Sequence, residues 1–135
     1  MPLTSAGPDR VPPPPLVVAA SLAALEAVAL AALGALELVN LRAIRLTMGL
    51  TTSAFFLGAA VALAWCAWSL WNVRRWARAP VVMAELIVLG LAWNLRGSGT
   101  TLLAIVLAVA ALVAIAGLLH PATTAVLEDE PEDQP

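Results

Sequence analysis

The sequence predicts an all-helical membrane protein, an antiparallel four-helix transmembrane bundle, and three observations support this fold class. The 135 residues are 61% hydrophobic and 12% charged, whereas an ordinary soluble domain is about 45–50% apolar and about 25% charged. Charged and proline-rich segments divide the chain into four long apolar runs, each close to the roughly 20 residues that cross a bilayer. These runs lack the short alternating segments of barrel strands, which favours helices.

The first two predicted helices span residues 16–39 and 47–70, and arginine-containing segments separate them from their neighbours. Both are long enough to cross a bilayer with residues to spare. The first run is longer than the roughly 7–15 apolar residues of a cleavable signal peptide and contains Glu26. It is therefore interpreted as a retained membrane anchor.

The third and fourth predicted helices span residues 80–95 and 101–119. Pro80 suits a first helical turn, where its missing N–H has no partner in any case. The third span is short and should stand nearly upright in the bilayer. His120-Pro121 is a typical helix stop after the fourth. Connections of only a few residues predict antiparallel neighbours.

The two ends of the chain are predicted to be disordered. Residues 1–15 contain a proline run that disfavours both helix and sheet, and residues 120–135 are rich in acids and prolines with little to bury. Five of the nine acidic residues lie within the last eight positions: Glu128, Asp129, Glu130, Glu132 and Asp133.

The arginine distribution predicts a multi-pass protein of the inner or plasma membrane with both termini in the cytoplasm. This placement leaves four arginines in the cytoplasm and three outside, a slight preference under the positive-inside rule. Tryptophan and arginine collect at membrane–water interfaces, and eight such residues are predicted interface anchors. They are Trp65, Trp68, Trp71, Trp76, Trp93, Arg74, Arg75 and Arg78.

Composition excludes most metalloenzymes and redox enzymes. One cysteine and one histidine provide neither an internal disulfide nor a Cys/His metal cage. The absence of lysine excludes a Walker phosphate loop and a lysine Schiff base. There is no basic patch for nucleic acid. We therefore expect a protein that is not an enzyme, with no cofactor and no metal.

Three carboxylates within the apolar runs are the candidate polar or proton sites: Glu26, Glu37 and Glu85. Ionisable groups at such depth are functional candidates by default. Glu26 and Glu37 are 11 residues apart, which is about three turns and places them on one helix face. In an antiparallel bundle Glu85 reaches the same half of the membrane as Glu26, so contact between them is possible.

The roles of these acids remain open between three interpretations. Desolvation favours the uncharged form of Glu26, which then donates a hydrogen bond between helices, while Glu37 stays ionised with Arg42 or Arg45. In the first interpretation the acids are polar pins that hold helices together. In the second they form a proton or cation relay, and in the third they line a groove for a lipid or small ligand.

A small-residue stripe is also predicted on the second helix. Gly58, Ala62 and Cys66 follow each other at intervals of four residues, the spacing that allows close helix packing in membranes. Cys66 is accordingly interpreted as a packing residue and not as a nucleophile.

The segment from Arg74 to Val82 contains the element R-x-x-A-R-x-P, and the segment from Leu118 to Thr123 contains L-H-P-A. With these elements, residues 16–127 resemble small four-helix integral membrane proteins of actinobacteria, a family without an assigned activity. The alanine-rich, lysine-free composition fits such a source. In that family the position of Glu85 is often glutamine, which implies hydrogen bonding there. The resemblance implies the architecture and location but no catalytic residue.

The expected function is that of a non-enzymatic scaffold or accessory subunit of a membrane assembly. Its expected partners are the lipid bilayer and either another membrane protein or further copies of itself. The alternative is an oligomeric small transporter, or a proton- or cation-conducting component, that uses the intramembrane glutamates.

Overall fold

The computed structural model describes residues 11–97 and 99–129, and this part of the chain is helical without strands. Four long helices account for most of it, with two short 3-10 helices in the connections and a short helix at the end. The elements are α1 (Pro14–Val39), η1 (Ala43–Arg45), α2 (Leu46–Trp71), η2 (Arg75–Ala77), α3 (Arg78–Asn94), α4 (Thr101–Leu119) and α5 (Pro121–Glu128).

The four long helices agree with the four predicted runs to within two residues at each boundary. α1 starts two residues early because prolines occupy its first turn, where a missing N–H costs nothing. α3 also starts two residues early, at Arg78, so that Pro80 still lies in the first turn. Gly97 and Gly99, with φ of 88° and 80°, provide the left-handed conformations in the connection to α4.

The end of α2 is capped in an unusual way. Val73 adopts a left-handed conformation with φ of 57°, which costs a β-branched residue about 1–2 kcal/mol. Its amide donates to the carbonyl of Leu70, and the amide of Arg74 donates to that of Ser69, as in a Schellman motif. The side chain of Val73 is buried, and this burial offsets the backbone cost.

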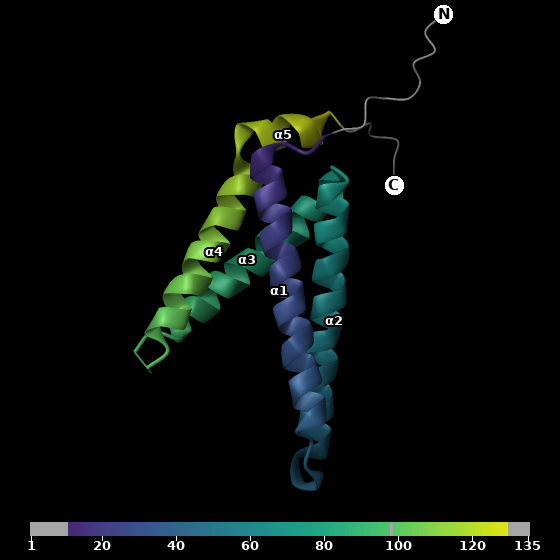
Figure 1. Ribbon diagram of the computed structural model, residues 1–135, viewed down its shortest axis with the longest axis vertical. Helices are drawn as coiled ribbons and strands as arrows, with labels where there is room; N and C mark the ends of the chain where they lie inside the picture. The colour runs from purple at the N-terminus through teal and green to yellow at the C-terminus, as the bar shows by residue number, and fades with distance from the viewer. Residues whose placement is uncertain (1–10, 98, 130–135) are drawn as a thin grey trace, which may run out of the picture.

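The long helices form two hairpins, α1 with α2 and α3 with α4 (Figure 1). α1 also packs on α4, whereas α2 and α3 touch only slightly. The hairpins meet close to α5 and diverge toward their other ends (Figure 1). Leu16, Leu118 and Leu127, from α1, α4 and α5, are completely buried, and Leu70 of α2 and Val81 of α3 are buried to the same degree.

Gly117 permits the close approach of α4 to α1. A Cβ atom added to it would lie 2.5 Å from the carbonyl oxygen of Pro15 and 3.3 Å from the Cβ of Ala19. Non-bonded carbon and oxygen atoms do not approach this closely, so only glycine fits at this point.

The structure differs from the prediction for the C-terminal tail. Residues 120–135 were expected to be disordered as a whole, but Pro121–Glu128 form α5. The Nδ1 atom of His120 accepts the amide of Ala122 at 3.1 Å, and the hydroxyl of Thr123 donates to the carbonyl of Gly117 at 2.7 Å. Thr123 and Leu127 are fully buried, so this segment does have surface to bury. Residues 130–135 lie outside the described part of the chain.

The N-terminal tail is described only from residue 11. Residues 1–10 of the predicted disordered segment 1–15 lie outside the described residues, and Pro14 and Pro15 belong to α1.

Four helical segments are long and apolar enough to cross a membrane: Pro14–Val39, Ala43–Trp71, Arg75–Asn94 and Thr101–Leu119. Only 22% to 28% of the residues in their most apolar stretches are buried within the chain. Most apolar side chains of these segments are therefore at least partly exposed, as expected of a multi-pass membrane protein surrounded by lipid or by other proteins.

Candidate functional site

Two of the three candidate carboxylates meet between the hairpins. Glu26 lies on α1 and Glu85 on α3, which crosses behind α1 in Figure 1. Their side chains are close enough to interact with each other. The side chain of Glu85 is completely buried, and none of the four carboxyl oxygens has a hydrogen-bond partner among the described residues.

The two carboxyl groups can share one proton. Two adjacent carboxylates repel each other in a medium of low dielectric constant, whereas one shared proton converts the repulsion into a hydrogen bond. The pair therefore belongs together as a single site. Through it, α3 makes a polar contact with α1, although the two backbones have few close approaches.

Glu37 is separate from this pair. It is half-buried on α1 and lies near Gly49 of α2, with its Oε1 atom 3.8 Å from the position that a Cβ of Gly49 would take. The expected ion pair with Arg42 or Arg45 is absent from the described residues. Arg45 instead contacts the sulfur of Met48 at 3.8 Å. The three acids consequently form no continuous chain, because each half of α1 directs its glutamate toward a different helix.

Ser53 and Gly34 make a polar contact within the α1–α2 hairpin that the sequence analysis missed. The buried hydroxyl of Ser53 donates to the carbonyl of Gly34 at 2.8 Å. A Cβ on Gly34 would overlap the side chain of Leu57. The predicted stripe of Gly58, Ala62 and Cys66 does not serve this packing, because Gly58 and Ala62 are exposed and a Cβ on Gly58 would meet nothing within 4 Å.

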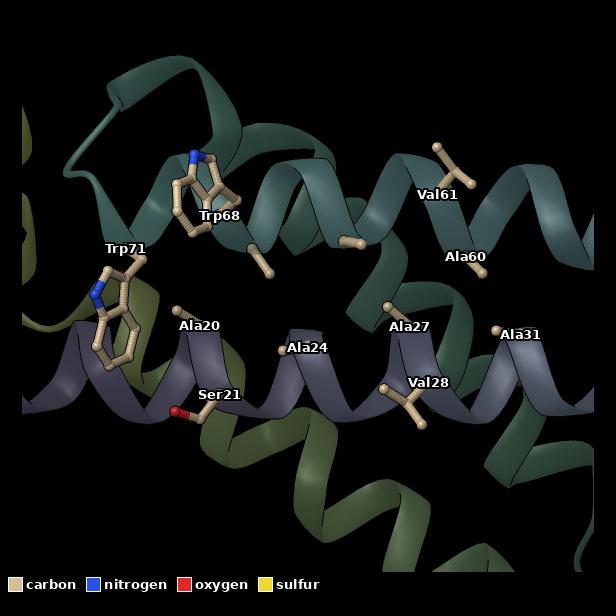
Figure 2. A pocket seen from close by; sticks show the side chains of 12 residues that line it. Ala20, Ser21, Ala24, Ala27, Val28, Ala31, Ala60, Val61, Trp68 and Trp71 are labelled. Carbon is tan, nitrogen blue, oxygen red and sulfur yellow. The ribbon is translucent and has the colours of Figure 1, made fainter.

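An open groove of about 560 Å³ runs along the α1–α2 hairpin. Seven of its twelve lining residues are alanine, and Figure 2 shows alanines of both helices directed into the space between them. Trp71 lies at one end of the groove (Figure 2). The lining consists of Ala20, Ser21, Ala24, Ala27, Val28 and Ala31 from α1, and of Ala60, Val61, Ala64, Ala67, Trp68 and Trp71 from α2.

The sequence contains a signal for this groove. On α1 the alanines at 20, 24, 27 and 31 alternate steps of four and three residues, and positions 60, 64, 67 and 71 on α2 follow the same steps. Such spacing places each set on one helix face. In a chain so rich in alanine the pattern has little contrast, and nothing in it indicates that the two sets face each other.

The predicted interface anchors lie on the surface. All five tryptophans are exposed to between 47% and 68%, which leaves their indoles accessible to an interface. The guanidinium of Arg96 stacks on Trp93, 3.2 Å from the ring centroid, a cation–π contact. Arg78 donates to the hydroxyl of Thr124 on α5 at 3.3 Å. Arg74, which is half-buried, and the exposed Arg75 lie in the connection between α2 and α3.

Metal-ligating side chains do not cluster in the described residues, where no three of the His, Cys, Asp or Glu residues gather. Cys66 is buried as a free thiol, which is compatible with the predicted packing role. His120 is used as the N-cap of α5.

Comparison with known proteins gives no match to a family model, a curated protein or a solved structure.

Proposed function

We propose that the protein is a non-enzymatic scaffold or accessory subunit of a membrane assembly, and that a transmembrane helix of its partner protein binds in the α1–α2 groove. The observation that carries this proposal is the open groove of about 560 Å³ with its alanine lining. Helices in membranes associate by van der Waals packing where small side chains let backbones approach. A groove with small residues on both walls meets this requirement.

The shape of the protein supports the same function. Only 22% to 28% of the residues in each span's most apolar stretch are buried within the chain, so most of each span is accessible to lipid or to a second protein. The α1–α2 hairpin and the α3–α4 hairpin diverge away from α5 (Figure 1). The α1–α2 groove is open along its hairpin, which makes it accessible to a second protein.

The proposal includes a topology. The chain crosses an inner or plasma membrane four times as an antiparallel bundle, with both termini in the cytoplasm. The start of α1 and the end of α5 lie at the same end of the molecule in Figure 1, which supports an even number of crossings. The slight excess of arginines on that side supports the cytoplasmic assignment.

The test combines partner capture with obstruction of the groove. Tagged protein is purified from its host in mild detergent, and co-purifying proteins are identified by mass spectrometry. Ala24→Leu with Ala64→Leu adds bulk to both walls. Since overpacking costs about 1–3 kcal/mol and 1.4 kcal/mol is a factor of ten in binding, we expect partner recovery to fall about tenfold.

The matched control is Ala62→Leu, an equal change at an exposed position of α2 outside the groove; it should leave recovery unchanged. A photoreactive diazirine amino acid at position 64 then identifies what occupies the groove. Cross-links to the captured protein support the proposal. Cross-links to lipid alone, or to a second copy of the chain, refute it.

The Glu26–Glu85 pair favours a second candidate function, an oligomeric transporter or a proton- or cation-conducting component. A buried carboxyl pair with no other partner can hold or release a proton without losing a structural bond to a third group. Intramembrane carboxyls of this kind occur in proton relays.

This alternative is tested by proton flux into proteoliposomes under an imposed membrane potential, measured with a trapped pH-sensitive dye. Glu26→Gln and Glu85→Gln should each abolish the flux. Glu128→Gln, at an exposed position of α5 outside the spans, should retain it. Absence of flux in the unmodified protein excludes the conducting role.

A further inference from the structure

A second groove, of about 390 Å³, lies at the beginning of α3 and is unrelated to the α1–α2 groove. Arg75 and Arg78 line one part of it, and Ala79, Val82, Met83 and Leu86 line the rest. The apolar positions recur at intervals of three and four residues, so the groove follows one face of α3 away from its charged end.

The apolar part of this groove, called here the apolar strip, covers much of one leaflet of a bilayer. It runs from Ala79 to Leu86 on α3, and seven residues at 1.5 Å each give about 10 Å. Half of the roughly 30 Å hydrocarbon core is about 15 Å. With the arginines at the membrane surface, an acyl chain along the strip is therefore in contact with α3 over about two-thirds of a leaflet.

The charged end of the strip lies where lipid headgroups are expected. Trp71 precedes the arginine-rich connection and Trp76 lies within it. Each is 47% exposed, and indoles concentrate at the membrane–water interface. The N-terminus of α3 begins at Arg78 and adds the positive end of its helix dipole. The acid nearest in sequence on α3, Glu85, is buried away from this exposed face.

Arg78 is held in place at the groove. Arg78 as a residue is half-buried, and its guanidinium donates to the hydroxyl of Thr124 on α5. Guanidinium has five N–H donors, so this contact positions the group and leaves donors for an anion. Planar guanidinium is well matched to phosphate oxygens.

We propose that this groove binds one anionic phospholipid, with its phosphate at Arg75 and Arg78 and one acyl chain along Val82, Met83 and Leu86. Charge complementarity and the adjoining apolar strip select this occupant. Free phosphate would leave the apolar strip uncovered, and a choline headgroup would bring a further cation to two arginines. Basic sites beside transmembrane helices bind anionic headgroups by the same attraction.

The experiment measures lipid retention by native mass spectrometry of the full-length protein released from nanodiscs that contain equal amounts of phosphatidylglycerol and phosphatidylcholine. The unmodified protein should retain about one phosphatidylglycerol per chain. Each arginine near a membrane surface strengthens anion binding about fivefold. We therefore expect Arg75→Gln with Arg78→Gln to weaken retention about 30-fold, and Arg75→Lys with Arg78→Lys to preserve most of it.

The matched control is Arg42→Gln with Arg45→Gln, which removes an exposed arginine pair before α2; it should leave retention unchanged. Met83→Ala with Leu86→Ala should weaken binding of long-chain phosphatidylglycerol but not of a short-chain analogue. Equal retention of both lipids, equal loss in the control pair, or full displacement by inorganic phosphate would each overturn the proposal. Circular dichroism of every variant verifies that the helices are intact.

Discussion

Replacement of Gly117 by alanine tests how the two hairpins are joined. The new Cβ would lie 2.5 Å from the carbonyl oxygen of Pro15 and 3.3 Å from the Cβ of Ala19. The first of these contacts is to backbone, which cannot rotate away as a side chain does. α1 and α4 must therefore separate at the point where the buried Leu16 and Leu118 also lie.

The expected magnitude follows from two opposing terms. Overpacking of a well-packed core costs about 1–3 kcal/mol, and the exchange of glycine for alanine within a helix returns up to about 1 kcal/mol. Gly117→Ala should thus lower the free energy of unfolding by about 1–2 kcal/mol. Gly58→Ala and Gly90→Ala should gain only the stabilisation that alanine brings to a helix, since a Cβ at either position meets nothing within 4 Å.

The assay is unfolding in mixed micelles by titration with sodium dodecyl sulfate, followed by tryptophan fluorescence. Gly117→Ala should unfold at a lower detergent fraction than the unmodified protein, and the two controls at an equal or higher one. If Gly117→Ala were as stable as Gly58→Ala, the close packing of α4 on α1 would not exist.

The remaining predictions concern single contacts and use the same titration unless stated. Ser53→Ala should lower the free energy of unfolding by about 0.5–1.5 kcal/mol, because a buried hydrogen bond to Gly34 is lost. Thr51→Ala removes a hydroxyl that bonds only within α2 and should change stability little. Equal effects of the two variants would contradict the role of the Ser53 bond. Val73→Gly should be more stable than Val73→Ala by about 1 kcal/mol, because alanine keeps the left-handed backbone cost; the reverse order would refute that cost. His120→Ala should increase amide hydrogen exchange in α5, because it removes the N-cap acceptor. His120→Asn keeps an acceptor and should leave exchange near that of the unmodified protein. Unchanged exchange in the alanine variant would show that α5 does not need the cap.

The existence of the helices could be read from the sequence because the bilayer imposes a length and a composition. An uninterrupted apolar run of about 20 residues is stable in lipid as a helix, because every backbone N–H and C=O group is then hydrogen-bonded within the same segment. α5 was missed because it is short and its stability depends on contacts. Thr123 and Leu127 are buried only once α4 and α1 are in place.

Part of the candidate site could likewise be predicted from the sequence, and part could not. Carboxylates within apolar runs stand out in any sequence, and the helix rise correctly indicated that Glu26 could meet Glu85. Their isolation from Glu37 could not be foreseen. It depends on which helix each part of α1 faces, and the hairpins diverge in a way that loop lengths do not specify (Figure 1).

The sequence by itself thus determined the number of helices that are long and apolar enough to span a membrane, and their limits, since these follow from hydropathy along the chain. Only the tertiary structure decided which alanines face each other across a groove, which glycine bears the closest helix contact, and which arginines lie at the end of an apolar strip. Small apolar side chains all favour lipid to a similar degree, so hydropathy cannot rank their faces. The choice is made by packing, through van der Waals contacts that exist only when two helices meet.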